Sequence, residues 1–179
     1  MIPPTTLPID SHLSLVRFRP SDAPAIFSLI DRNREHLSQF GDTTLRKYPA
    51  ESNVLESIVN PIRPNRHRFG IWDGNTLVGS VNIEFIEGLA EVGYYLGQEF
   101  QGKKYMTKAV KRIVQYGFEQ LGLDEIIAET ANLNMPSRAV LFAAGFRAEK
   151  EYERDGTTYV MHALTRKEWD SRRDSRDMF

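Results

Sequence analysis

The chain contains no cysteine among its 179 residues. This absence excludes disulfide bonds, thiolate metal sites and a cysteine nucleophile, so any thiol chemistry has to come from a ligand. An excess of charge of one sign is also lacking, because 23 Lys and Arg residues nearly balance 24 Asp and Glu residues. A global basic field for nucleic acid or anionic membrane is therefore excluded, and an anion site has to be local.

Long apolar runs are missing as well. No stretch approaches the roughly 20 residues that cross a membrane, and the opening MIPPTTLPID lacks the charged and apolar regions of a secretory signal. We therefore expect a cytoplasmic protein. The histidines show no ligand-like spacing, so no metal is predicted. A hydrophobic content of 41% predicts a single globular domain over residues 1–179, with its core at about 12–169 and polar tails at both ends.

The hydrophobic pattern predicts strands and helices that alternate along the chain. Strands are predicted at 12–19, in a three-stranded antiparallel meander over 66–96, at 124–130, and in a last hairpin that turns at Asp155 and Gly156. Helices are predicted after Ser21, at 51–59, before Gly122 and at 137–144. The helix before Gly122 carries the chain across the sheet, so the strand at 124–130 is expected to lie parallel to the end of the meander. The charged tail from Arg166 predicts a frayed helix.

The stretch EFQGKKYMTKAV, residues 99–110, places a glycine and two lysines where a helix begins. The amide N–H groups of a first helical turn lack partners, and the helix macrodipole makes that end positive. This combination favours an anion bound at the start of the helix. The alternative is an ordinary capped helix with solvated lysines.

The predicted order, β-α-α-β-β-β-α-β-α-β-β, together with this glutamine-led turn, resembles the GCN-five-related N-acetyltransferases, the GNAT superfamily. The chain is especially similar to the RimJ/RimL type, which acetylates N-terminal amines of ribosomal proteins. The likeness covers roughly residues 12–169 and rests on DRNREHL, AEVGYYL, FQGKKYMTKAV and NMPSRAVLFAAGF. It implies an α+β fold with a mixed sheet, in which strands 4 and 5 splay apart to take the pantetheine arm of acetyl-CoA.

The resemblance also implies how acetyl-CoA is held. Gln101 takes the first place of the family's turn, Gln/Arg-x-x-Gly-x-Gly/Ala, while Lys104 and Met106 stand at its two small-residue places. Lysine for glycine is a departure, and its ammonium either pairs with a phosphate or is solvated. The pyrophosphate is expected on the amides from Gly102 through Thr107, and the pantetheine on backbone groups near Tyr95 and Leu96. The expected cofactor-binding residues are Tyr95, Leu96, Gln101, Gly102, Lys103, Lys104, Tyr105, Met106, Thr107 and Asn134.

For the base, Glu91 matches the place where related acetyltransferases carry the glutamate that takes a proton from the amine. Glu84 is the competing carboxylate, and the alternative for Glu91 is a strand glutamate paired with a basic neighbour. An N-terminal α-amine titrates near ~7.7–8.0 and a lysine near ~10.4, so the α-amine is the easier nucleophile at neutral pH.

For the leaving group, many superfamily members carry Asn-x-x-Ala-x-x-x-Tyr, whose tyrosine protonates the departing thiolate. Here Asn134 fits, but Ser137 replaces the alanine and Leu141 the tyrosine. The RimL-type branch suggests Ser137 as a donor to the CoA sulfur, and because serine is a very weak acid we expect a stabilising donor and not a proton source. A structural alternative is compatible with this donor role: Ser137 is a polar residue in the first turn of the helix, and Asn134 caps the helix. Asn134 is also a candidate to bond the pantetheine.

Together these features imply an enzyme that moves an acetyl group from acetyl-CoA to a primary amine by direct attack in a ternary complex. The N-terminal α-amine of a protein or peptide is the preferred acceptor. Asn33 is expected to contact this acceptor, unless Asn33 is simply an exposed polar residue of a helix. The alternatives are a small amine, such as an antibiotic, polyamine or peptide natural product, or a CoA-binding module without catalysis. No nucleic acid or membrane partner is expected, and similar enzymes often pair as homodimers.

Overall fold

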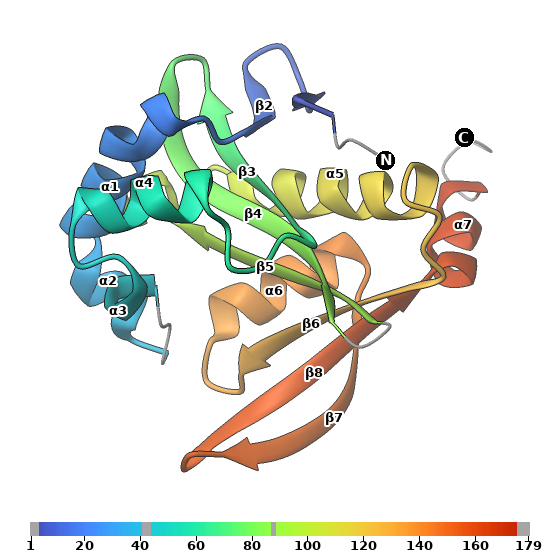
Figure 1. The fold of residues 1–179 in the computed structure, drawn as a ribbon. Helices are drawn as coiled ribbons and strands as arrows, with labels where there is room; N and C mark the ends of the chain where they lie inside the picture. Colours follow the sequence, from blue (N-terminus) through green and yellow to red (C-terminus); the bar gives the residue numbers. More distant parts are fainter. Residues whose placement is uncertain (1–3, 41–43, 87–88, 175–179) are drawn as a thin grey trace.

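The structure, a computed structural model, describes residues 4–40, 44–86 and 89–174. Within these residues eight strands form one mixed sheet in the order β1-β2-β3-β4-β5-β6-β8-β7 (Figure 1). The strands are β1 Thr6–Pro8, β2 Leu13–Arg17, β3 Arg66–Asp73, β4 Thr76–Ile86, β5 Leu89–Leu96, β6 Glu125–Ala131, β7 Arg147–Arg154 and β8 Thr157–Thr165. The helices are α1 Ala23–Arg32, α2 Arg34–Ser38, α3 Thr44–Lys47, α4 Glu51–Val59, α5 Tyr105–Glu119, α6 Met135–Ala144 and α7 Arg166–Asp174.

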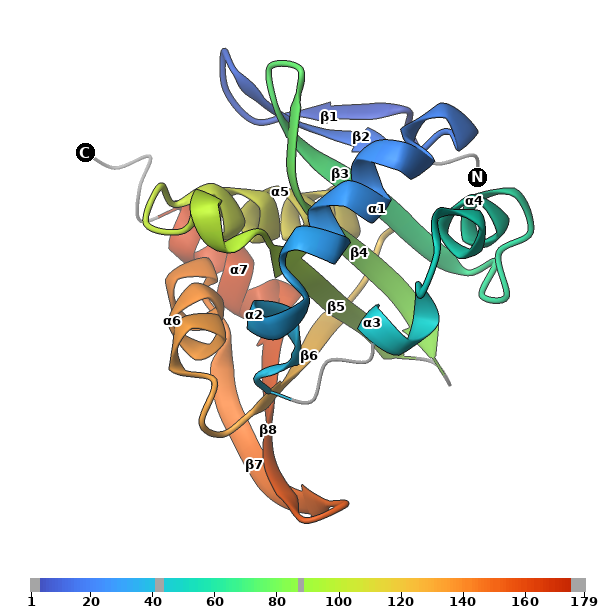
Figure 2. The ribbon, with the colours of Figure 1, turned by 90° about the vertical axis from the view of Figure 1, so that its left-hand side faces the viewer.

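Helices cover both faces of the sheet, and each face has its own apolar cluster. Ile26 of α1 and Val54 of α4 pack with Leu77 on one face, while Ile113 of α5 packs with Val92 on the other. Figure 2 shows α5, α6 and α7 on the left of the sheet and α4 on the right. Because side chains alternate along a strand, β5 sends its even-numbered residues toward α5 and its odd-numbered residues toward α1.

The predicted order of strands and helices is confirmed, with additions. The expectation of a polar tail before residue 12 is wrong, because β1 pairs antiparallel with β2 and the side chain of Leu7 is 2% exposed. The first helix breaks at Asn33 into α1 and α2, and α3 follows. The tail from Arg166 forms α7, whose Trp169 ring lies 5.2 Å from the ring of Phe118. None of the helices in the described ranges is long and apolar enough to cross a membrane.

The neighbours of β5 are joined to it in very different ways. β4 and β5 pair antiparallel at eight positions, from Gly79 opposite Leu96 to Ile86 opposite Leu89. β5 and β6 are parallel, as predicted, but in the described residues they pair only at Glu91 opposite Ile127. Beyond that pair the two strands diverge (Figure 1). The predicted splay, between the fourth and fifth strands of the sequence pattern, is therefore confirmed between β5 and β6.

Candidate active site

The gap between β5 and β6 is edged by backbone groups of specific residues. The amide of Gly97 donates to the carbonyl of Val78 at 3.0 Å, and the carbonyl of Tyr95 faces Gly79, so both residues direct their backbone groups at β4. Alternate residues of a strand point these groups at opposite neighbours. Tyr94 and Leu96 therefore face the gap. The predicted backbone role of Leu96 is compatible with this register. The backbone groups of Tyr95 point at β4 instead, so Tyr94 is the neighbouring residue whose backbone faces the gap.

The start of α5 lies at the end of β5 where the gap is open. In the described part of the chain the amides from Gly102 through Thr107 have no acceptor, and the first bonded amide is that of Lys108, which reaches the carbonyl of Lys104 at 3.1 Å. The backbone turns through positive φ at Gly102 (78°) and Lys104 (60°). Lys104 thus adopts the left-handed conformation that glycine takes without strain, at a cost of roughly 1–2 kcal/mol.

Two glutamates lie side by side where β5 and β6 part. Glu84 and Glu91 are opposite each other on β4 and β5, so their side chains share the face covered by α1. Glu84 is 6% exposed and forms ion pairs with Arg63 at 3.0 Å and Arg66 at 2.8 Å. Among the residues with described positions, Glu91 has neither an ion pair nor a hydrogen bond. The alternative interpretation of Glu91, a strand glutamate paired with a basic neighbour, therefore describes Glu84 and not Glu91.

The environment of Glu91 favours its neutral form. Burial raises the pKa of the Glu91 carboxyl, and the negative charges of Glu129 and Glu84 raise it further. The neighbouring arginines oppose this shift without cancelling it. A carboxylate with a raised pKa is a stronger base than an ordinary one, which is what proton transfer near neutral pH requires.

A hydroxyl pair links β5 to the helix that follows β6. The Tyr94 hydroxyl lies 2.9 Å from Oγ of Ser137 and 3.1 Å from its carbonyl oxygen, to which it donates. Burial raises the pKa of Tyr94, so its phenol keeps its proton. The side chain of Asn134 accepts from the amide of Ser137 at 3.1 Å, which confirms the predicted helix cap. Sequence reasoning missed Tyr94, for which AEVGYYL gave no signal beyond strand register.

Comparison with known proteins agrees with this geometry. The model of the acetyltransferase (GNAT) domain matches residues 12–147. This chain belongs to the GNAT family. "Putative ribosomal N-acetyltransferase YdaF" of Bacillus subtilis (strain 168) is 25% identical in an alignment that covers 92% of this chain and 97% of that protein.

Solved structures share the fold of this GNAT protein. A ribosomal-protein-S5-alanine acetyltransferase from Vibrio fischeri superimposes with a TM-score of 0.82 at 23% identity, over 92% of this chain and 98% of that one. The ribosomal L7/L12 α-N-protein acetyltransferase RimL, solved with coenzyme A, gives a TM-score of 0.81 at 20% identity, over 89% and 97%. The chain is thus an N-acetyltransferase of a family that uses acetyl-CoA.

The turn that precedes α5 in this GNAT domain is anchored to α1 and α2. Oδ1 of Asn33 accepts from the amide of Gln98 at 2.8 Å, and its Nδ2 donates to the carbonyl of Leu29 at 2.9 Å. Asn33 is 4% exposed, so its interpretation as an exposed polar residue of a helix is wrong. The contacts of its side-chain amide give no support to the predicted contact with substrate. Gln101 reaches His36 at 3.1 Å, and Glu99 pairs with Arg32 at 2.6 Å.

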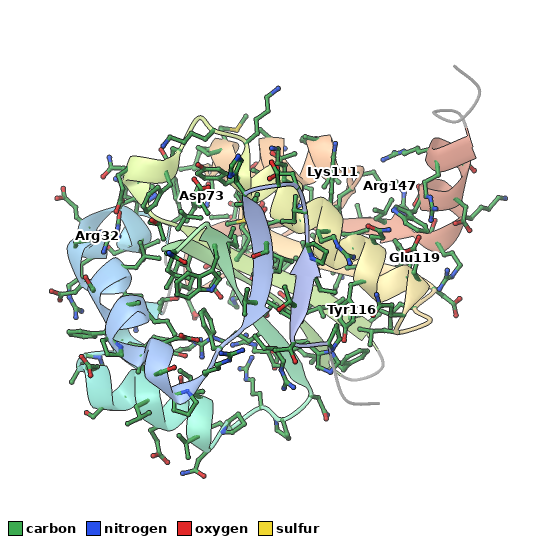
Figure 3. The ribbon with its side chains drawn as sticks, turned by 90° about the horizontal axis from the view of Figure 1, so that it is seen from above. Arg32, Asp73, Lys111, Tyr116, Glu119 and Arg147 are labelled. Carbon is green, nitrogen blue, oxygen red and sulfur yellow. The ribbon has the colours of Figure 1, made fainter. Side chains whose placement is uncertain are left out.

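The remaining side chains of the turn divide into anchored and free ones. The Tyr105 hydroxyl donates to Asp73, which raises the pKa of Tyr105; Figure 3 shows Asp73 on the side where α5 begins. The Lys103 ammonium lies 5.8 Å from the centroid of the Tyr105 ring, and Met106 is buried. Lys104 is exposed and has no side-chain partner within the described ranges. The same ranges hold no cluster of three or more side chains that suits a metal ion.

Proposed function

We propose that this GNAT enzyme takes its acetyl group from acetyl-CoA and transfers it to the N-terminal α-amine of a protein or peptide. The observation that carries the proposal is Glu91, a partly buried carboxylate without a partner in the described residues, placed at the single pair where β5 and β6 separate. The names of YdaF and RimL, both called ribosomal acetyltransferases, support a protein acceptor.

The residues around the gap fit the donor. The free amides from Gly102 through Thr107 would hold its pyrophosphate, and the gap-facing backbone groups of Tyr94 and Leu96 would pair with its pantetheine amides as a neighbouring strand does. When bound, acetyl-CoA supplies a thioester carbonyl to the amine. Lys104 stands at the mouth of the gap, where its charge would face the phosphates.

Glu91 prepares the nucleophile. At pH 7 the removal of a proton costs about 1 to 1.4 kcal/mol for an α-amine and more than about 4 kcal/mol for a lysine side chain. A weak base is therefore sufficient for the first, and the raised pKa of Glu91 suits it to that task. The amine nitrogen forms a bond to the carbonyl carbon, the carbon–sulfur bond breaks, and the amine proton passes to Glu91. A gap-facing amide of β5 stabilises the oxyanion.

Ser137 assists the departure of the sulfur. When the Tyr94 hydroxyl turns its proton from the Ser137 carbonyl to Oγ of Ser137, the serine hydroxyl is free to donate a hydrogen bond to the leaving thiolate. Tyr94 then holds the serine from the opposite side of the gap. Neither hydroxyl is acidic enough to be the main source of a proton, since the pKa of Tyr94 is raised. We therefore assign Ser137 the role of a donor and Tyr94 that of a positioning residue.

Isotope-labelled acetyl-CoA offers a direct test. Peptides with a free α-amine, the same peptides with a blocked N-terminus and an internal lysine, and a panel of small amines are incubated with the enzyme and analysed by mass spectrometry. We expect label on the free α-amine and release of one thiol per acetyl group. Label confined to lysine side chains or small amines, or a trapped acyl-enzyme, would contradict the proposal.

A further inference from the structure

A cavity lies on the same face of the sheet as Glu91, between β3, α4 and the loop that follows α4. Its volume is about 640 Å³, and its lining carries far more positive than negative charge. The charged residues that line this "arginine cavity" from the Glu91 face are Lys47, Arg63, Arg66, Arg68 and Glu56. Arg17 also borders the cavity, but it pairs with Phe69 and its charge acts on His67 and Tyr116, on the face covered by α5.

The positive charge of the arginine cavity is only partly neutralised. Arg63 and Arg66 share the carboxylate of Glu84, at 3.0 and 2.8 Å. The remaining cations, Lys47 and Arg68, take part in no ion pair with any residue that the structure describes. The cavity therefore offers a local field that attracts an anion in a chain whose overall charge is close to zero.

The contacts of Arg68 explain why its positive charge is not neutralised. Its Nη1 donates only to the neutral hydroxyls of Tyr48 (3.2 Å) and Ser57 (3.0 Å), and its guanidinium lies 4.9 Å from the centroid of the Phe18 ring. Its Nη2 is buried and has no acceptor in the described part of the chain. Hydroxyl and aromatic contacts fix the guanidinium but leave its charge unmatched.

The arginine cavity begins close to the proposed base. Arg66, Glu84 and Glu91 lie opposite one another on three consecutive strands, and residues so paired point to the same face. Two inter-strand spacings separate Arg66 from Glu91, which amounts to roughly 10 Å. An extended peptide rises about 3.3 Å per residue, so an acidic side chain two to four residues after an α-amine at Glu91 reaches the cavity.

We propose that the arginine cavity binds an anionic group of the acceptor, a carboxylate or a phosphate, held about 10 Å from the amine that is acetylated. This inference rests on the proposed function and names its substrate class: an N-terminus followed closely by an acidic residue, or an amine of similar reach that carries a phosphate. The cavity thereby selects the acceptor, and Glu91 performs the proton transfer.

Acceptor kinetics provide the first test. Peptides that differ only by Asp or Asn, or by phosphoserine or serine, at positions two to four are compared by kcat/KM. We expect the anionic member of a pair to be favoured at least fivefold, through KM, and the preference to fall below twofold in Lys47→Gln. Arg68→Gln is a further variant, which also loses the contacts of Arg68 with Tyr48 and Ser57. In Lys111→Gln, an exposed lysine on α5 outside the cavity, the preference is expected to persist (Figure 3).

Binding of blocked peptides separates this inference from the proposed activity. The same Asp and Asn peptides, acetylated at their N-termini, are titrated into the full-length enzyme by calorimetry. Tighter binding of the Asp peptide, lost in Lys47→Gln, supports the anion site even if no peptide is acetylated, in which case only the activity is overturned. Equal binding of the two peptides, or a preference unchanged by Lys47→Gln, overturns the anion site even if acetylation proceeds. A larger gain with phosphoserine than with Asp identifies a phosphate as the preferred group, and the reverse identifies a carboxylate.

Discussion

The two edges of β5 differ more than any other pair of neighbouring regions in this sheet. Toward β4 the strand pairs at eight positions, and toward β6 it pairs at one within the described residues. Backbone groups inside a protein are nearly always paired, so an edge left open between two strands of one sheet indicates where a ligand completes the ladder. In the proposed function, β5 is thus part of the scaffold along its β4 edge and a binding surface along its β6 edge.

The same contrast separates the two glutamates beside that junction. Glu84, on the fully paired side, is held by two arginines, whereas Glu91, where the strands part, lacks a partner in the described structure. In the proposed function, the surroundings of the two glutamates alone give Glu84 a structural role and Glu91 a chemical one.

The largest effect is expected from Glu91→Gln. Loss of a general base lowers the rate by about 10² to 10⁴-fold, while the affinity for CoA stays unchanged because no contact with the donor is removed. Steady-state thiol release and calorimetry measure the two quantities. Glu151→Gln, an exposed glutamate on β7, is the matched control and is expected to behave as wild type.

Thermal unfolding of the same variant sharpens the contrast. A raised pKa means that the folded state prefers protonated Glu91, so its stabilising contribution is complete below the ordinary carboxyl pKa and is lost as pH rises through the raised value. Glutamine mimics the protonated form, so Glu91→Gln should unfold at a higher temperature than wild type at neutral pH and at the same temperature in acid. Glu84→Gln should instead destabilise, because it leaves two arginines without their carboxylate. If both variants lowered the unfolding temperature, the contrast between the two glutamates would be lost.

The hydrogen bond between Tyr94 and Ser137, which crosses the gap between β5 and β6, predicts a smaller effect on kcat. Tyr94→Phe removes a hydroxyl that holds Ser137, a hydrogen bond of about 1 kcal/mol, so kcat is expected to fall about fivefold. Because the two residues act together, Ser137→Ala combined with Tyr94→Phe should cost less than the two single effects summed. Tyr152→Phe on β7 is the control. Full additivity in the double-mutant cycle would show that Tyr94 does not position Ser137.

At the mouth of the gap, Lys104→Gly is expected to stabilise the protein. Glycine relieves the strain of the left-handed conformation but loses more chain entropy on folding, which leaves a net gain of about 0.5 to 1 kcal/mol in the free energy of unfolding. Lys103→Gly is a close control, because Lys103 lacks a positive φ and should lose stability. Urea denaturation measures both changes, and a loss of stability in Lys104→Gly would refute the strained turn.

The smallest effect is a displacement of the pH profile. Ionised Glu91 is the active base, so kcat/KM rises with pH through the pKa of Glu91. Glu129→Gln removes a negative charge that raises this pKa, and the acidic limb of the profile should move to lower pH. A limb that stays in place, or moves to higher pH, would exclude Glu91 as the group that titrates.

Local patterns predicted much of the fold. Apolar stripes, hairpin turns and the crossover between parallel strands were sufficient for the order of elements, and the helix predicted at 137–144 does end before Gly145, which adopts the left-handed conformation. The strand β1 escaped prediction because three residues, the last of them Pro8, form no readable period. Such patterns depend on near neighbours in the chain, which a single sequence displays directly.

Parts of the site depend on contacts between distant segments and could not be predicted. Asn33 is buried against Gln98, a partner 65 residues away, so nothing local distinguishes it from exposed polarity. Which of Tyr94 and Tyr95 turns its backbone groups toward the gap depends on the hydrogen-bond register of β5 with β4, which a single sequence does not display. Arg68 joins the arginine cavity only because α4 folds over β3, as its bond to Ser57 shows.

Amide hydrogen exchange, followed by NMR with and without CoA, tests the central assignment most directly. We predict that CoA slows exchange at Tyr94, Leu96 and residues 102–107, and leaves the amides of Tyr95 and Gly97 unchanged because they already bond to β4. Slowed exchange confined to other regions, with the open edge and the start of α5 unaffected, would show that the donor does not lie between β5 and β6.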